Sequence, residues 1–485
     1  MRPRSRTIVA SAVLVSLFLP AAPLSATCGG GGGGGMGGAT PGGGGGGKAA
    51  EVYHVPWKIV GAADPIPSGD LSVYWFPTSA DEAKKSTLLG SRGLTLASAR
   101  CVAMALITPD NAAPRGKYGV DGSAVVLVGR DGAELGRVTP QGSTFDSDVA
   151  ENLLSTELDK RETAAKALLD AAKEKQEAKD EDGAAALYTQ VWEQRCLFPD
   201  LAKKASKGLK KLGKPVQDAS LWDGGMPNLE KKTSQRIVGL MNAGMAAERD
   251  ENPVEANKFY EAARKLDPAD PVPVRFLGEL MRHHIGDWVA ARALFEQVLA
   301  MPSDPVSRAV ALHGLGKMTI HEGRYDEGLT LFKLSLDAYP LALTYRNLAV
   351  YWNSERDHVQ AHAYVDKALA LDPEDPYNLI FAATYYVELG RPDEARAVAK
   401  QYESVLAASY NLAAIHAQLG DKQQALAMLE RHFHEYEKFD AVRSKEMREA
   451  RDDQSLASLH GDPEFIALTD RADPEPANPM KRTGS

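Results

Sequence analysis

Small residues recur at regular intervals through the C-terminal half of the chain, and this repeat constrains the fold more than any other feature. They stand 30 to 37 residues apart, at Ala256, Ala291, Gly328, Ala361, Ala395 and Ala425. A period near 34 residues is typical of a stack of helix-turn-helix units. The sequence therefore predicts an all-α solenoid of about six units over residues 233–435.

Other residues repeat in step with the first set. Each predicted first helix carries a second small residue, where the two helices of a hairpin press together: Gly244, Gly278, Gly316, Ala349, Ala383 and Ala413. Turns fall at Gly286, Gly323, Gly390 and Gly420, and the second unit has one extra residue before Gly286. Four units end on a proline, which stops a helix: Pro268, Pro302, Pro340 and Pro373.

This pattern resembles the tetratricopeptide repeat family. The resemblance implies a right-handed superhelix whose concave side, lined by the first helices, binds peptides or partner helices. The groove residues that it implies are Asn242, Arg275, Lys317, Arg346, Asn347, Tyr351, Tyr385, Asn411 and His416. Alternatively, the three asparagines share one repeat position and bond within the scaffold. Residues 436–470 resemble the capping helices that close such arrays, and residues 471–485 are expected to be a disordered tail.

The N-terminus has the pattern of a targeting segment. Three arginines precede an apolar run at residues 7–19, and small residues follow, so residues 1–27 are predicted to be a signal peptide. Cys28 resembles the lipid-acceptor cysteine of bacterial lipoproteins. The alternative is ordinary cleavage after Ala26, which leaves a soluble protein. Residues 28–50 are nearly all glycine and predict a flexible tether.

Residues 51–150 predict an α/β unit. Apolar runs at residues 71–76, 101–108 and 123–128 predict strands, and residues 81–100 between the first two predict a helix. Strand, helix and strand in this order indicate a parallel pair. Residues 124–128 and 132–138 predict an antiparallel hairpin around Gly129-Arg130-Asp131-Gly132.

The unit resembles the thioredoxin superfamily through Val73-Tyr74-Trp75-Phe76, the stretch Lys117 to Gly122 and the hairpin. The resemblance places the family's two cysteines at Ala80 and Ala83, and its cis-proline at Ala124. Thiol exchange needs a thiolate, which alanine cannot supply. We therefore predict a redox-dead domain.

Residues 151–230 predict a helical connector, with helices at 149–179, 182–196 and 201–212. Ala184, Tyr188 and Val191 look like the second helix of a degenerate repeat. The lysines between Lys203 and Lys211 predict a solvated face, with a binding patch as the alternative.

Two further groups of residues have the chemistry of reactive or metal sites. Cys101 and Cys196 are predicted to be buried, inert thiols, and a bridge between them is the alternative. His358 and His362 lie four residues apart, but the glutamate of a zinc-protease motif is replaced by Val359. We expect surface histidines there and neither a metal nor a cofactor.

Composition limits the function further. With 56 basic and 65 acidic side chains and a net charge of −9, the chain lacks the basic balance typical of nucleic-acid binders. The sequence predicts a multidomain, non-catalytic scaffold of the bacterial cell envelope whose solenoid holds protein or peptide partners, with Cys28 as a membrane anchor. The alternatives are a thiol-disulfide oxidoreductase or redox chaperone using a lone cysteine, and an envelope assembly factor.

Overall fold

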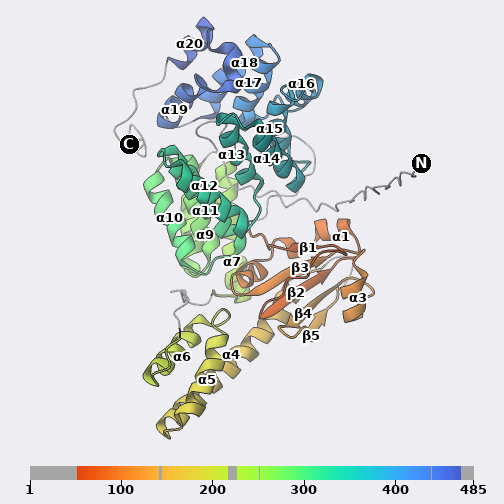
Figure 1. Cartoon of the computed structure of the whole chain (residues 1–485), viewed down its shortest axis with the longest axis vertical. Coiled ribbons are helices and arrows are strands. Elements are labelled where there is room, and N and C mark those ends of the chain that lie inside the picture. Colours follow the sequence, from red (N-terminus) through yellow and green to blue (C-terminus); the bar gives the residue numbers. More distant parts are fainter. Residues whose placement is uncertain (1–51, 141–144, 217–226, 251, 438–439, 471–485) are drawn as a thin grey trace, which may run out of the picture.

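The computed structural model describes residues 52–140, 145–216, 227–250, 252–437 and 440–470. The predicted signal peptide, Cys28, the tether and the C-terminal tail lie outside these residues. Figure 1 shows an N-terminal sheet unit, an arm of three helices and a long stack of helix pairs.

The sheet unit has five strands in the order β1-β3-β2-β4-β5. They are β1 (Lys58–Val60), β2 (Leu71–Phe76), β3 (Val102–Ile107), β4 (Ala124–Gly129) and β5 (Glu134–Val138). β3 is parallel to β1 and β2, β4 is antiparallel to β2, and β5 is antiparallel to β4. The predicted parallel pair and hairpin are confirmed. β1 was not predicted, because three residues carry too little periodicity.

The single helix predicted over residues 81–100 is wrong. The chain instead forms α1 (Ala80–Lys85), the 3-10 turn η1 (Thr87–Leu89) and α2 (Arg92–Ser98). Ser86 caps η1 by accepting from the Leu88 N–H, and Ser91 caps α2 by accepting from the Leu94 N–H. Serine side chains compete for backbone groups in this way and end helices. A further helix, α3 (Ala112–Tyr118), was not predicted.

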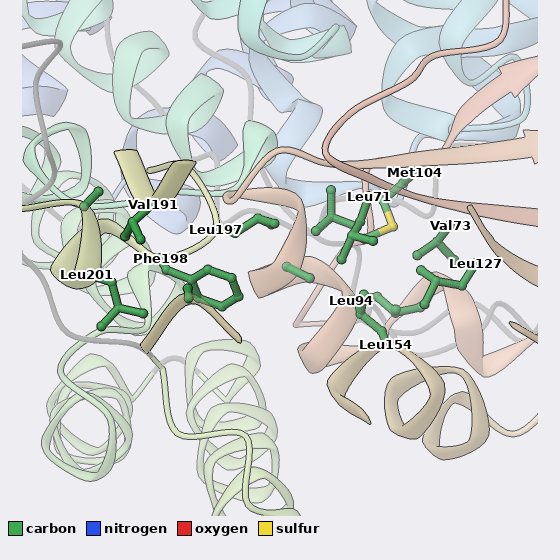
Figure 2. Close-up of a cluster of buried hydrophobic side chains, with 14 of the residues drawn as sticks. Leu71, Val73, Leu94, Met104, Leu127, Leu154, Val191, Leu197, Phe198 and Leu201 are labelled. Atoms are coloured by element: carbon green, nitrogen blue, oxygen red, sulfur yellow. The ribbon is translucent and has the colours of Figure 1, made fainter. Parts of the chain in front are cut away.

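The arm consists of α4 (Ser147–Glu177), α5 (Glu181–Glu193) and α6 (Pro199–Lys211), as predicted to within three residues. One hydrophobic cluster runs from the sheet through α4 into the arm (Figure 2). It joins side chains of the strands, α2, α4 and the arm: Leu71, Val73, Met104, Leu127, Leu94, Leu154, Val191, Leu197, Phe198 and Leu201. The sheet unit and the arm therefore share one core.

Six helix pairs follow. They are α7 (Lys231–Arg249) with α8 (Pro253–Leu266), α9 (Pro271–Leu280) with α10 (Trp288–Ala300), α11 (Pro305–His321) with α12 (Tyr325–Ala338), α13 (Ala342–Ser354) with α14 (His358–Leu371), α15 (Pro376–Tyr386) with α16 (Pro392–Gln401), and α17 (Ser409–Gln418) with α18 (Lys422–Arg431). The predicted solenoid of about six units is confirmed as a TPR-like stack of helix pairs.

The remaining short elements are η3 (Leu406–Ala408), the π-helical turn η4 (His432–Tyr436), α19 (Asp440–Ala450), η5 (Gln454–Leu459) and α20 (Pro463–Thr469). The last three pack onto the end of the stack through Leu456, Phe465 and other apolar side chains.

The pairing of small with large residues explains the close packing of the hairpins. Phe295 of α10 lies over Gly278 of its own pair, and a Cβ there would stand 2.7 Å from the ring. The rings of Tyr260 and Phe332 lie in the same way over Gly244 and Gly316. The extra residue in the second unit is accommodated by η2 (Met281–Ile285), a π-helical turn at the end of α9.

The turns within the pairs use the left-handed backbone region. Gly286, Gly323, Gly390 and Gly420 have φ between 72° and 80°, where glycine meets no Cβ penalty. The fourth pair places Arg356 at this position, with φ 62°, and the α4–α5 turn places Lys179 there, with φ 61°. The shared geometry supports the interpretation of α4 and α5 as a degenerate repeat.

We expect Arg356→Gly to raise the free energy of unfolding by about 0.5–1 kcal/mol, since it removes a left-handed non-glycine residue. Glu355→Gly is the matched control, because Glu355 has φ −78° and gains nothing from glycine. Urea denaturation of both variants checks the prediction. A loss of stability in both would contradict it.

Candidate peptide-binding site

The first helices of the solenoid present polar and charged side chains where the resemblance places the groove. Arg275 and Glu279 lie on α9, Arg282 on η2, and His313 and Lys317 on α11. All five are less than 9% exposed. The predicted open groove is therefore filled along these two helices, and its side chains are not displayed to solvent.

A short segment of the chain's own N-terminal region, residues 52–54, lies against the solenoid. The Val52 carbonyl accepts a hydrogen bond from Arg275 Nη2 at 3.2 Å. The Tyr53 hydroxyl donates to Asp270 Oδ2 at 2.7 Å, and His54 Nε2 is 2.9 Å from the Tyr339 hydroxyl. Val52 and Tyr53 also join the apolar cluster of α7, α8 and α9. The solenoid thus holds this segment by both its main chain and its side chains.

A buried ion cluster joins this segment to the sheet unit. We call Tyr53, Arg92, Asp267, Asp270 and Arg275 the edge cluster. Arg92 begins α2, and its guanidinium contacts both aspartates, with Nε 2.9 Å from Asp270 Oδ2. Its Nη1 also donates to the Asn228 carbonyl and to Ser234 Oγ.

The ionisation of this cluster depends on a balance between burial and charge. Burial disfavours a charged guanidinium, but Asp270, Tyr53 and Asp267 together outweigh burial and raise the pKa of Arg92. Arg92 therefore stays charged, whereas burial raises the pKa of the Asp270 carboxyl, so acid would weaken the pair from the aspartate side.

The wall formed by α9, η2 and α11, next to the edge cluster, contains a second group of buried charges. Arg282 lies 3.3 Å from Glu279. Burial opposes ionisation of Glu279, but Arg282 together with His283 and His313 lowers the pKa of that carboxyl to about 2. Burial also lowers the pKa of His283 to about 3, and that of His313 well below its ordinary value. The wall therefore holds one ion pair beside two neutral histidines.

Acid should destabilise the protein through three buried histidines. Burial lowers the pKa of His54 to about 4, with Arg275 adding to the shift, and His283 and His313 are lowered as described. Below pH about 6.5 each histidine takes up a proton in the unfolded chain but not in the native one, so stability falls as the pH falls towards 4. Each should contribute a slope of about 1.4 kcal/mol per pH unit.

Urea denaturation between pH 7.5 and 4.5 measures this slope. His313 faces Arg282, Glu279, Lys317 and His283, and His313→Gln should reduce the slope by about 1.4 kcal/mol per pH unit. His358→Gln is the control, since that side chain is 53% exposed. Equal slopes in all three proteins would contradict the prediction.

Several of the predicted groove residues bond between neighbouring repeats. Lys317 Nζ on α11 donates to Asn347 Oδ1 on α13 at 3.0 Å. Arg346 on α13 donates to Asn378 on α15. Each contact joins the first helices of adjacent pairs, so these side chains align the stack.

The other predicted groove residues differ in exposure. Tyr385 and Asn411 are buried, with the Tyr385 ring edge-to-face against Phe381. Asn242 is exposed, and Tyr351 and His416 are partly exposed. Tyr351 lies between Tyr325 and Trp352, and His416 Nδ1 is 3.6 Å from the Asp421 carboxylate. Together with the partly exposed Asn347, these are the predicted groove residues that are not buried.

Glu279 and His313 were not among the predicted groove residues, although the repeat register contained a signal for both. Glu279 follows Gly278 as Lys317 follows Gly316. His313 stands two residues before Leu315, as Arg275 stands before Leu277. Tyr53, Arg92, Asp267 and Asp270 had no such signal, because their partners are 175 to 217 residues away.

The three positions of the lost thioredoxin motif lie at one end of the sheet. Ala80 and Ala83 belong to α1 and line a shallow hollow with Leu106 and Thr108. Ala124 begins β4 and pairs with Phe76 at the end of β2. No peptide bond within the described residues is cis.

The prediction of two free, buried thiols is wrong. Cys101 and Cys196 form a disulfide with a Cα–Cα distance of 5.8 Å, which joins the start of β3 to the α5–α6 connection. The bridge was the weaker alternative because cysteines 95 residues apart give no local signal. The alternative function, a thiol-disulfide oxidoreductase or redox chaperone, needed a free thiol at Cys101 or Cys196. Both thiols are used in the disulfide.

The histidine pair weighed as a metal site faces a carboxylate. His358 Nδ1 and His362 Nε2 are 3.7 Å and 3.8 Å from Glu388 Oε2. Across the described ranges, no three His, Cys, Asp or Glu side chains form a group that could hold a metal ion. Within those same ranges, every helix is too short or too polar to cross a bilayer.

Comparison with known proteins finds tetratricopeptide repeats in this chain. Residues 354–405 and residues 406–431 each match a model described as tetratricopeptide repeat. Among curated proteins, the chain is similar to Cellulose synthase operon protein C of Xanthomonas axonopodis pv. citri (strain 306). The two are 27% identical over 209 residues, which are 41% of this chain but only 12% of that relative.

Three solved structures show the extent of the structural similarity. Pseudomonas aeruginosa pilF is 16% identical with a TM-score of 0.31, over 42% of this chain and 94% of that one. PilW, described as a widely conserved type IV pilus biogenesis factor, is 15% identical with a TM-score of 0.29. The match covers 51% of this chain and 96% of PilW. YrrB, a TPR protein described as having an unusual peptide-binding site, is 21% identical with a TM-score of 0.24. The match covers 36% of this chain and 90% of YrrB.

Proposed function

We propose that this protein is a non-catalytic scaffold of the bacterial cell envelope whose repeat solenoid holds an extended partner polypeptide. The observation that carries the proposal is the seating of residues 52–54 on the solenoid, where Val52 and Tyr53 contact α9 and its capping residue, and His54 contacts Tyr339 after α12. There the solenoid already holds a segment of chain without helix or strand structure, through a main-chain carbonyl and two side chains. A tetratricopeptide repeat array that holds its own segment in this way has the contacts that a foreign peptide needs.

A nonapeptide with the sequence of residues 50–58 tests whether α9 binds extended chains in trans. In the wild type the site is occupied, whereas Tyr53→Ala removes the hydroxyl bond to Asp270 and weakens the segment's hold. We expect a fluorescent peptide to bind the Tyr53→Ala protein more tightly than the wild type. Adding Arg275→Met should reduce that binding at least five-fold, because it removes the donor to the carbonyl. Absence of peptide binding to the Tyr53→Ala protein would refute this role for α9.

The partner itself can be sought at the exposed groove positions. A photo-crosslinking residue at Asn242 or Tyr351 should capture one polypeptide in membranes of the producing cell. The same residue at Lys333 or Lys400, which are exposed on second helices, is the control. Equal capture at all four positions would count against a specific groove.

The sheet unit is proposed to be a thioredoxin-like domain that has lost its chemistry. The strand order and directions support this interpretation, with Ala80 and Ala83 following the carboxyl end of β2. Cys101 precedes β3, at the opposite end of the two parallel strands, and is bonded to Cys196. The unit then serves as a platform that presents residues 52–54 to the solenoid.

The envelope location is supported by the sequence before residue 51. An apolar run after three arginines, Cys28 and a glycine-rich stretch together favour export and tethering. The similarity to a protein named for a cellulose synthase operon also favours a second candidate function, the assembly of an exported polymer. Loss of an envelope polymer in a deletion strain, restored by the wild type but not by a groove variant, would favour that candidate.

A further inference from the structure

The outer face of α6 carries a row of lysines that the solenoid function does not use. α6 buries Leu201, Ala202, Ala205 and Leu209 in the core of the arm. Its other face exposes Lys204, Lys207, Lys210 and Lys211. We call these four residues the lysine face. Figure 1 shows α6 on the side of the arm away from the sheet.

The lysine face is not neutralised by the surrounding chain. On α4, by contrast, Lys160, Lys166 and Lys173 each pair with a carboxylate three or four residues earlier. Near α6, Asp182 pairs with Lys214 at 2.6 Å. Within the described part of the chain, the four lysines of the lysine face make no ion pair. The lysine face is therefore a local excess of positive charge on a protein of net charge −9, open to an anionic partner.

We propose that the lysine face binds the anionic headgroups of a phospholipid membrane. A lysine near such a surface strengthens binding about five-fold, so four together can supply about 10³-fold. The apolar side of α6 is already buried in the arm, so this binding would rest on charge alone. The proposal is independent of what the solenoid binds.

The type of side chain favours a membrane over an acidic protein. Recognition of individual carboxylates in a protein partner typically uses arginine, whose planar group binds them in a bidentate way. α6 contains lysine and no arginine. Lysines are hydrated point charges, which suit a diffuse layer of negative charge.

Flotation with vesicles tests the proposal. The full chain carries Cys28→Ala in every arm, so a lipid anchor at that position cannot contribute. We expect it to bind phosphatidylcholine vesicles that contain phosphatidylglycerol, and to bind pure phosphatidylcholine at least ten-fold less. Binding should fall steeply between about 0.05 M and 0.5 M salt, because the charges are screened.

The decisive variant replaces all four lysines of the lysine face by glutamate and should lose the binding to anionic vesicles. The matched control places glutamate at Lys58, Lys258, Lys333 and Lys400, which are exposed elsewhere and give the same change in net charge. It should keep at least half of the binding. Equal loss in both variants, or no binding by the parent chain, would overturn the proposal. Binding to polyglutamate but not to vesicles would also overturn it and assign the face to an acidic polypeptide.

Discussion

Replacing Arg92 by methionine will lower the free energy of unfolding by about 3–5 kcal/mol, because it leaves two buried carboxylates without their counter-charge. Asp267 and Asp270 are 3% and 0% exposed, and Arg92 contacts both. Methionine keeps much of the side-chain volume, so the loss would report the missing charge and not a cavity. Urea denaturation followed by circular dichroism measures it.

Arg130→Met is the matched control for this substitution. Arg130 also pairs with an aspartate, Asp70, but its side chain is 72% exposed. Exposed pairs contribute about 0–1 kcal/mol, so this variant should stay close to the wild type. Adding Asp267→Asn and Asp270→Asn to Arg92→Met should recover part of the loss. A small loss in Arg92→Met, or no recovery, would show that the edge cluster does not hold the sheet unit on the solenoid.

Replacing Cys101 and Cys196 together by serine will lower the free energy of unfolding by about 4–5 kcal/mol. The disulfide closes a loop with a sequence separation of 95 residues, and a cross-link of that length strongly restricts the unfolded chain. The effect should be largest for the core that the sheet and the arm share. The midpoint of urea denaturation, monitored through the tryptophans of that core, provides the measurement.

Dithiothreitol supplies the control for the disulfide. It should shift the midpoint of the wild type to that of the double-serine protein, and it should leave the double-serine protein unchanged. A wild type that is insensitive to the reductant under denaturing conditions would show that the two cysteines are not bonded.

The solenoid could be predicted from the sequence because its contacts are local. Each hairpin places a small residue under a large one within about 20 positions, as with Gly278 and Phe295, so the pattern repeats along the chain. Even the π-helical turn at residues 281–285 had a signal, the extra residue before Gly286. Strands β2 to β5 were predicted for a similar reason, since each is a short apolar or alternating run beside a turn.

The edge cluster and the filled groove could not be predicted, because they depend on contacts between distant parts of the chain. Whether Arg275 faces water or a carbonyl depends on where Val52 lies, and 223 positions separate the two. Repeat register placed Lys317 and Arg346 on first helices. It could not show that Asn347 and Asn378 of the next repeats would bind them. The helix at residues 112–118 was not predicted, because it contains Pro114 and Gly116, and both residue types have low helix propensity.

The continuity of α4 has a mechanical consequence. Its 31 residues make a rod of about 46 Å. Ala150 and Leu154 lock one end to the sheet, and Ala165, Leu169 and Ala172 lock the other end into the arm. α4 is one uninterrupted helix, so a rotation of α6 would also rotate the sheet. A surface that binds the arm would therefore also fix the orientation of the sheet unit.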